Sequence, residues 1–171
     1  MDLVIELAND EDFINLAPVP KKGVDERERE ELITRFFAYG DGLEEYKDRP
    51  SEFLFNYSKM MNERFSNDTK IAENYRELFR KTMAFVASVF PYGFKRNSKG
   101  SATPRARFEA IAIGSKLALD KFPFLEAKNV PSVDIWLTSK DFNNVIGSDG
   151  ANAKSRLRER MNFVFRKLVD D

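Results

Sequence analysis

The stretch EREREELITRFFAYGDGLEEYKDRPSEFL, residues 26–54, decides the fold of this chain. Its apolar residues recur at spacings of three and four, the spacing of a helix that buries one face. Asp25 stands just before this pattern and is expected to cap a helix over residues 26–39, with glutamates crowded at the positive end of the helix dipole. The residues of the predicted buried stripe are Leu32, Ile33, Phe36, Phe37 and Tyr39.

Glycine and proline mark where this helix ends and where the next ones begin and end. Gly40 and Gly42 are expected to end it, because glycine adopts backbone conformations that other residues disfavour. Pro50 opens a second helix, since proline suits the first helical position. A third helix over residues 68–90, capped by Asn67 or Asp68, stops before Pro91, which cannot donate a helical hydrogen bond.

The C-terminal half continues in the same way. Residues 91–104 form a basic loop rich in turn residues, and the Thr103-Pro104 pair then begins a helix that runs to about residue 121. One or two short helices follow over residues 131–145, and a last helix begins near Asn152. We therefore expect an all-α fold, a single multi-helix bundle of about six or seven helices, in one domain over residues 1–171.

The charges balance overall but are unevenly distributed. The chain holds 28 basic and 28 acidic residues. Residues 1–50 carry 14 acidic and 7 basic side chains, net −7; residues 91–128 carry 8 basic and 3 acidic, net +5; residues 150–171 carry 6 basic and 3 acidic, net +3. If the two basic segments share a face, they create a local positive field despite the neutral total.

The residue types that are missing restrict the possible chemistry. The chain has no His and no Cys, which excludes a histidine base, a cysteine nucleophile and thiolate or imidazole metal centres. Its first residues are acidic, unlike a signal peptide, and no apolar run approaches the ~18 residues of a membrane span. We expect a cytoplasmic protein that is not an enzyme by itself, with no catalytic residue, no metal site, no cofactor and no membrane contact.

The basic side chains are the candidate nucleic-acid-binding residues, because Lys and Arg contacts to phosphates give salt-sensitive affinity for DNA. On the last predicted helix, residues four apart face the same way, which pairs Lys154 with Arg158 and Arg156 with Arg160. The opposite interpretation is that these charges are solvated or pair with the acidic N-terminal third. The full candidate set is Lys95, Arg96, Lys99, Arg105, Arg107, Lys154, Arg156, Arg158 and Arg160.

Two other kinds of site are weaker candidates. Carboxylates crowd within residues 25–31 and 41–45, which allows a carboxylate–magnesium site, although most of them serve the helix dipole. The GSDG turn at residues 147–150 could hold an anion on backbone amides with Lys154 and Ser155. It lacks the Walker spacing, so a loop and a helix cap explain it more simply.

Five runs of the sequence, taken in order, resemble one prokaryotic family. They are Glu31-Leu32-Ile33-Thr34-Arg35-Phe36-Phe37-Ala38, residues 50–54, residues 90–96, Arg107-Phe108-Glu109-Ala110, and residues 148–163. The family is domain of unknown function two-six-two, whose members include the GmrSD-type restriction endonucleases. The resemblance implies that these helices are the C-terminal portion of a larger nuclease-family protein, and that Arg35, Arg96 and Arg160 bridge helices through carboxylates.

The resemblance also implies a function without catalysis. In the family, an N-terminal half carries an Asp-Gly-Gln-Gln-Arg motif tied to nucleotide hydrolysis or DNA cleavage, and this chain lacks the motif. We expect a helical accessory region of a restriction or anti-phage defence protein, which supports the nuclease or nucleotidase half by packing, oligomerisation or nucleic-acid contact. The alternatives are a stand-alone DNA-binding protein that uses residues 95–107 and 154–160, and a carboxylate–magnesium nuclease.

Overall fold

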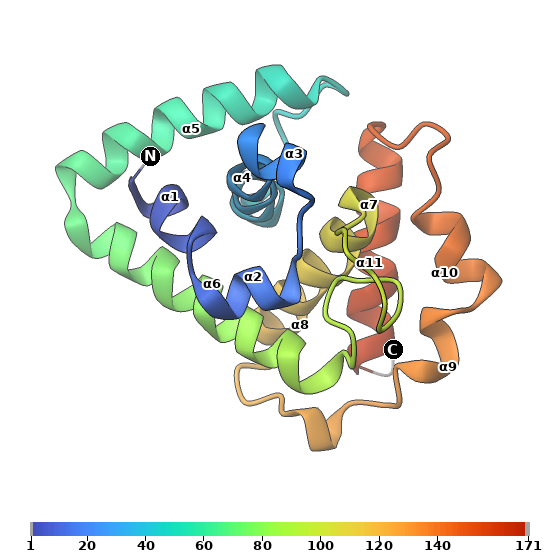
Figure 1. The fold of residues 1–171 in the computed structure, drawn as a ribbon. Coiled ribbons are helices and arrows are strands. Elements are labelled where there is room, and N and C mark those ends of the chain that lie inside the picture. The colour runs from blue at the N-terminus through green and yellow to red at the C-terminus, as the bar shows by residue number, and fades with distance from the viewer. Residues whose placement is uncertain (1, 170–171) are drawn as a thin grey trace.

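In the computed structural model, which describes residues 2–169, the chain is helical along most of its length and contains no strand within those residues (Figure 1). The predicted all-α class is confirmed. The described residues form ten helices when the π-helical turn that joins two α-helical pieces is counted with them. The excess over six or seven comes from three short helices before residue 26, which the sequence pattern did not indicate.

The bounds of the helices follow the proline and cap signals closely. A π-helical turn, η1 (Glu109–Ile113), joins α7 to α8, and a 3-10 turn, η2 (Ala127–Asn129), precedes α9. The α-helices are α1 (Asp2–Ala8), α2 (Glu11–Leu16), α3 (Lys21–Asp25), α4 (Glu28–Asp41), α5 (Pro50–Asn67), α6 (Thr69–Val89), α7 (Arg105–Phe108), α8 (Gly114–Lys121), α9 (Asp134–Leu137), α10 (Lys140–Val145) and α11 (Lys154–Val169).

Side-chain caps fix several helix starts. The Asp68 carboxylate accepts from the Lys70 amide at 2.9 Å, so the predicted cap of α6 is confirmed, as is the start of α5 at Pro50. Ser139 caps α10 by accepting from the Phe142 amide at 3.1 Å. Each of these bonds satisfies an amide that has no partner inside its own helix.

Three predicted helix ends were wrong. Asp25 lies inside α3, and α4 starts after Arg27, whose backbone is left-handed (φ 58°), because α3 occupies the residues that were expected to lead into α4. Gly40 lies within α4, and only Gly42, at φ 141°, ends it. The Thr103 hydroxyl donates to the Pro18 carbonyl at 3.0 Å and therefore ties the loop to the N-terminal segment instead of capping α7.

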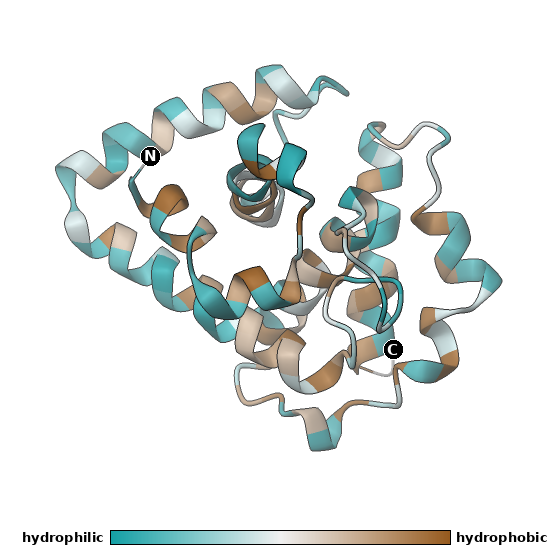
Figure 2. Ribbon diagram, viewed as in Figure 1, coloured by the Kyte–Doolittle hydropathy of each residue, from teal (hydrophilic) through white to brown (hydrophobic). Residues whose placement is uncertain are grey.

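The core lies around η1, whose five residues are all buried. This turn packs against α4, α6 and α11, so three long helices surround it (Figure 1). Phenylalanine rings meet edge to face beside it, with Phe13 and Phe36 each 5.3 Å from Phe79 between ring centroids. Such geometry stabilises aromatic pairs beyond the area they bury. Figure 2 shows apolar residues gathered where α1, α2 and α4 meet, while much of α5 is hydrophilic.

The long helices α5 and α6 form a splayed hairpin at one side of the molecule, and they diverge from their shared turn in a V (Figure 1). The hydroxyls of Tyr57 and Tyr75 both donate to one carboxylate oxygen of Asp41, each at 2.5 Å. Burial, followed by the nearby Asp41 carboxylate, raises the pKa of the Tyr75 hydroxyl to about 12. The two bonds hold the hairpin to the end of α4. Within residues 2–169, no helix combines the length and the apolar character needed to cross a membrane.

Helices α8 and α11 approach each other closely at Gly114, the first residue of α8. A Cβ atom placed there would lie 2.6 Å from Cβ of Val164 and 2.9 Å from the Met161 carbonyl oxygen, both on α11. Because one of these atoms is backbone, α11 cannot yield by turning a side chain. Only glycine allows α8 and α11 to pack at this distance.

We predict that Gly114→Ala lowers the free energy of unfolding by about 1–3 kcal/mol through overpacking, although alanine is the better helix former. Urea unfolding of the purified chain measures the effect. Gly40→Ala is the matched control, since the three atoms nearest to its added methyl all belong to the side chain of Lys116 and none to backbone. An equal or larger loss at Gly40 would contradict the proposed α8–α11 contact.

Candidate anion-binding pocket

Glu109, the first residue of η1, is a carboxylate at the centre of the fold, and only 1% of its surface is exposed. Both of its oxygens accept from arginines on other helices. Nη1 of Arg35, on α4, lies 2.9 Å from Oε1, and Nη1 of Arg160, on α11, lies 2.6 Å from Oε2. The carboxylate therefore joins three segments that are far apart in the sequence.

The charges around Glu109 are almost fully removed from water. Burial raises the pKa of the Glu109 carboxyl, and the guanidinium groups of Arg35 and Arg160 oppose that rise. Arg35 has further partners, since it pairs with Glu31 at 2.8 Å and donates to the Tyr39 hydroxyl at 2.9 Å. Burial acts against the charged form of Arg35, but these partners hold its pKa above the usual value. A buried charge of this kind is tolerated only when it is paired and hydrogen-bonded.

The predicted bridging role is confirmed for two of the three arginines. Arg35 and Arg160 each join helices through a carboxylate. The prediction was wrong for Arg96, which lies exposed in the turn-rich loop after Pro91. This loop keeps Arg96 outside the core, and its charge lowers the pKa of the nearby Arg107.

A hollow of about 550 Å³ lies beside the Glu109 cluster. It is walled by the loop after α6, by α7, by the end of α9 with α10, and by the loop that leads into α11. Four arginines and one glutamate line it, together with hydroxyl, amide and apolar side chains. The charged lining residues are Arg96, Arg105, Arg107, Arg160 and Glu109, and the neutral polar ones include Thr138, Asn143, Ser148 and Asn152.

Arg107 differs from the other arginines of this hollow. It is 4% exposed, and among residues 2–169 no carboxylate lies within ion-pair distance of it. Its Nε is buried without a hydrogen-bond partner, and its guanidinium carbon lies 5.3 Å from the centre of the Phe142 ring. Burial, and then the nearby charge of Arg96, lower the pKa of Arg107 to about 10. A cation–π contact offsets part of the cost of burying this charge but does not neutralise it.

The other predicted residues of the first basic segment lie around this hollow or on its loop. Arg105 lines the hollow and pairs with Glu31 at 3.3 Å, with about half of its side chain exposed. Lys95 is half-buried and Lys99 is exposed. The segment 95–107 therefore carries three arginines into one hollow and two lysines on the loop beside it.

The second basic segment is used mainly inside the protein. Nζ of Lys154 donates to the Glu44 carbonyl at 2.9 Å, and Arg156 donates to the Asn144 carbonyl and to Glu159, both at 2.6 Å. Arg160 holds Glu109 and the Ala151 carbonyl. Arg158 is exposed. Of the four candidates in the second segment, Arg160 alone lines the hollow together with residues of the first segment, and its charge is compensated by Glu109.

The loop over residues 146–153 forms one wall of the hollow and is held from three sides. Arg160 donates to the Ala151 carbonyl at 2.6 Å, and the Tyr46 hydroxyl donates to the Asn152 carbonyl at 2.6 Å. The amide of Lys154, at the start of α11, donates to the Asp48 carboxylate at 2.6 Å. The Asp48 carboxylate thus occupies the Lys154 amide, which the sequence pattern suggested as part of an anion site at the GSDG turn. Gly147 and Ser148 of that turn line the hollow instead.

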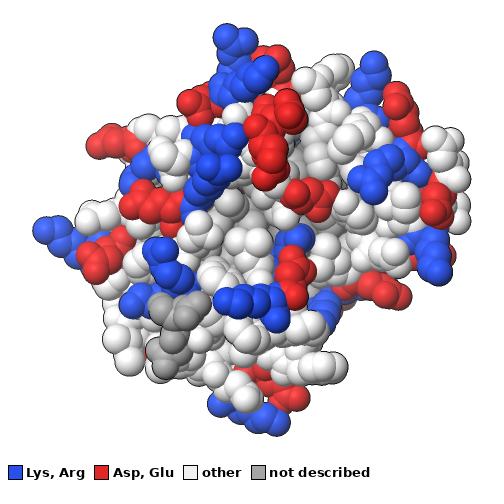
Figure 3. Space-filling model, turned by 180° about the vertical axis from the view of Figure 1, so that it is seen from behind, with Lys and Arg blue, Asp and Glu red and all other residues white. Residues whose placement is uncertain are grey.

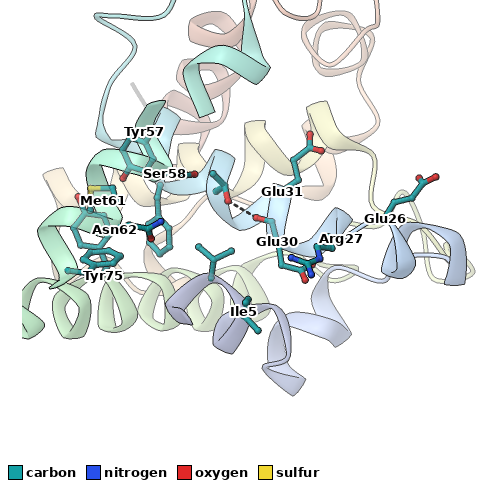
Figure 4. A pocket seen from close by; sticks show the side chains of 14 residues that line it. Ile5, Glu26, Arg27, Glu30, Glu31, Tyr57, Ser58, Met61, Asn62 and Tyr75 are labelled. Atoms are coloured by element: carbon teal, nitrogen blue, oxygen red, sulfur yellow. Dashed lines mark hydrogen bonds between the residues drawn. The ribbon is translucent and has the colours of Figure 1, made fainter. Parts of the chain in front are cut away.

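A second hollow, of about 310 Å³, lies between α1, α4, α5 and α6 and is more apolar (Figure 4). Thr34, within it, donates to the Glu30 carbonyl at 2.7 Å. Figure 4 shows that its labelled residues divide into two groups, with Tyr57, Ser58, Met61, Asn62 and Tyr75 at one end and Glu26, Arg27, Glu30 and Glu31 at the other. In the part of the chain that the structure describes, no three acidic side chains gather closely enough to hold a metal ion.

Sequence reasoning missed Glu109 as a site residue, although a signal was present. Glu109 is the one charged residue in the run from Phe108 to Gly114, which is otherwise apolar or small. A carboxylate in such a run is buried with its helix and requires a cationic partner. The family models, curated proteins and solved structures compared with this chain yield no match.

We predict that Glu109→Gln lowers the free energy of unfolding by about 3–5 kcal/mol, because it leaves two buried arginines without their carboxylate. Urea unfolding monitored by circular dichroism measures the loss. Glu52→Gln removes the partner of Arg49 in an exposed pair and should change stability by less than about 1 kcal/mol. Similar losses in the two variants would mean that Glu109 does not hold the core together.

Proposed function

We propose that this chain is a non-catalytic helical accessory region of a restriction-type defence protein, and that it contacts DNA phosphates through the loop 94–104 and the start of α7. The observation that carries the proposal is that Arg96, Arg105, Lys95 and Lys99 lie together on this loop and helix start, beside the hollow in which Arg107 is buried. Arginine and lysine contacts to phosphate supply most of the sequence-independent affinity for DNA.

The distribution of charge supports this choice of surface. On the face opposite the view of Figure 1, basic and acidic side chains are interspersed (Figure 3). Such a mixture favours neither cationic nor anionic partners. Around the hollow, in contrast, Glu109 is the only acidic lining residue and its two oxygens are already occupied. Within segment 95–107, Arg105 pairs with Glu31 at 3.3 Å, whereas the other four cations have no carboxylate partner among residues 2–169 and can serve an external anion.

The family resemblance supplies the biological context of the proposal. It suggests a nuclease or nucleotidase half as the partner, and contact with DNA implies a cytoplasmic location. Several large apolar side chains are exposed and offer surface for packing or oligomerisation, among them Phe124 at 94%, Ile135 at 81% and Phe55 at 70%. Exposed apolar groups of this size commonly mark contact surfaces when they cluster.

A stand-alone DNA-binding protein is the second candidate, because the same hollow would serve it. The sequence pattern assigns both basic segments to this candidate. Because Lys154, Arg156 and Arg160 are bonded within the protein, the structure favours a smaller DNA-binding surface centred on residues 95–107. If α11 also contacts DNA, its exposed Arg158 must contribute. The effect of Arg158→Glu on DNA binding distinguishes the two surfaces.

We predict that the double variant Lys95→Glu/Lys99→Glu weakens binding to a DNA duplex and reduces the slope of log affinity against log salt by about two, one unit for each lost phosphate contact. Fluorescence anisotropy over a series of salt concentrations measures both quantities. Neither lysine lines the hollow, so the arginines remain in place.

Lys59→Glu/Lys70→Glu is the matched control, with the same charge change on exposed positions of the α5–α6 hairpin. It should lose far less affinity than the loop variant. Equal losses would show that only net charge matters, and an absence of DNA binding by the unaltered chain would overturn the proposed function.

A further inference from the structure

Among residues 2–169, no carboxylate pairs with Arg107, and its guanidinium packs instead over the ring of Phe142. Arg35 and Arg160 are buried against Glu109, and Arg105 reaches Glu31, but Arg107 is equally buried and faces no carboxylate among residues 2–169. A buried cation without a counter-charge lowers stability. Proteins retain such strain where it serves a ligand, which makes Arg107 a marker of a site.

The surroundings of Arg107 are suited to an anion with several oxygens. Its guanidinium offers planar donors in a fixed geometry that matches phosphate. Arg96 stands at the rim, close enough to lower the pKa of Arg107 through its own charge. The Ser148 and Thr138 hydroxyls line the same hollow. Two cations that repel each other at one end of a hollow are both stabilised when an anion enters between them.

The rest of the hollow has room for more than a phosphate. Its volume of about 550 Å³ lies within the usual range of small-ligand sites, roughly 300–1,000 Å³. Leu137 and Ile146 supply apolar surface, and the amides of Asn143 and Asn152 supply both donors and acceptors. Such a lining fits a sugar and base attached to the phosphate.

We propose that this hollow binds one nucleotide through its terminal phosphate, which Arg107 and Arg96 hold. A terminal phosphate is attached on one side only and can enter the hollow to reach a side chain that is 4% exposed. A phosphate inside a strand carries a nucleotide on each side and is hindered from doing so. The phosphate comes either from a free mononucleotide or from the phosphorylated end of a DNA strand, and the second source rests on the proposed DNA contact.

The test is isothermal titration calorimetry of the whole chain with five probes. Three are small: inorganic phosphate, a deoxynucleoside 5′-monophosphate and the same deoxynucleoside without phosphate. The other two are a short single strand with a 5′-phosphate and the same strand without it. We expect the monophosphate to bind and the bare deoxynucleoside not to bind. Arg107→Met should weaken monophosphate binding by about 10- to 100-fold, the effect of losing charge-assisted hydrogen bonds. Arg166→Met, which changes an exposed arginine of α11 outside the hollow, should leave binding unchanged.

Stability provides an independent readout. Because Arg107→Met removes an uncompensated buried charge, its unfolding midpoint should stay the same or rise while binding is lost. If that variant does not fold, Arg96→Met, which changes an exposed side chain, must weaken binding instead.

The outcomes separate this proposal from the proposed function. Tighter binding of the phosphorylated strand than of its hydroxyl counterpart supports the strand end as the source, and binding of the monophosphate alone supports the free nucleotide. DNA binding through Lys95 and Lys99 without any phosphate-specific effect of Arg107→Met overturns the nucleotide site but not the DNA contact. Phosphate binding that both Arg107→Met and Arg96→Met leave unchanged also overturns the site.

Discussion

The carboxylate of Glu109 is the contact on which the rest of the structure depends. It accepts from Arg35 on α4 and from Arg160 on α11 at 2.9 and 2.6 Å, and it does so from the first residue of the buried π-helical turn. Removal of three charges from water is costly, and good geometry with full hydrogen bonding is what makes it tolerable. The same contact fixes how α4, η1 and α11 lie against one another, because the planar groups accept few alternative arrangements. π-helical turns are rare and are found frequently at functional sites.

The hollow beside Glu109 follows from this arrangement. Arg160 also donates to the Ala151 carbonyl, so the ion pair that holds the core positions the loop over residues 146–153 as a wall. Arg107 lies two residues before Glu109 and is buried with the same segment, yet no carboxylate of the described residues pairs with it. The segment thus contributes one carboxylate that is fully used inside the protein and one cation that is left for an external partner. The same short segment, from α7 into η1, therefore supplies both the central carboxylate of the fold and the central cation of the candidate site.

Much of the fold could be predicted from local patterns. The apolar spacing of residues 32–39, the proline at the start of α5 and the Asp68 cap of α6 act over a few residues, and each appears as expected. Some predictions from local signals were wrong because contacts with distant residues prevailed. Thr103 has the residue type of a cap and instead donates to the Pro18 carbonyl, 85 residues away. The short helices α1, α2 and α3 lack the length that makes periodicity visible, and packing against α4 and α6 stabilises them.

The sequence by itself determined the all-α class, the helices from α4 onward and the absence of histidine and cysteine chemistry, because all of these depend on residue type and short-range spacing. The family resemblance also singled out Arg35, Arg96 and Arg160 as helix-bridging arginines, correctly for Arg35 and Arg160. Only the tertiary structure decided which cations are compensated. Glu109 meets Arg35 across 74 residues and Arg160 across 51, and Lys154 meets Glu44 across 110. No local pattern records such pairings, so the sequence did not separate the compensated cations from the uncompensated ones. The fold neutralises some of the nine candidates and leaves Arg107 buried without a carboxylate partner among residues 2–169.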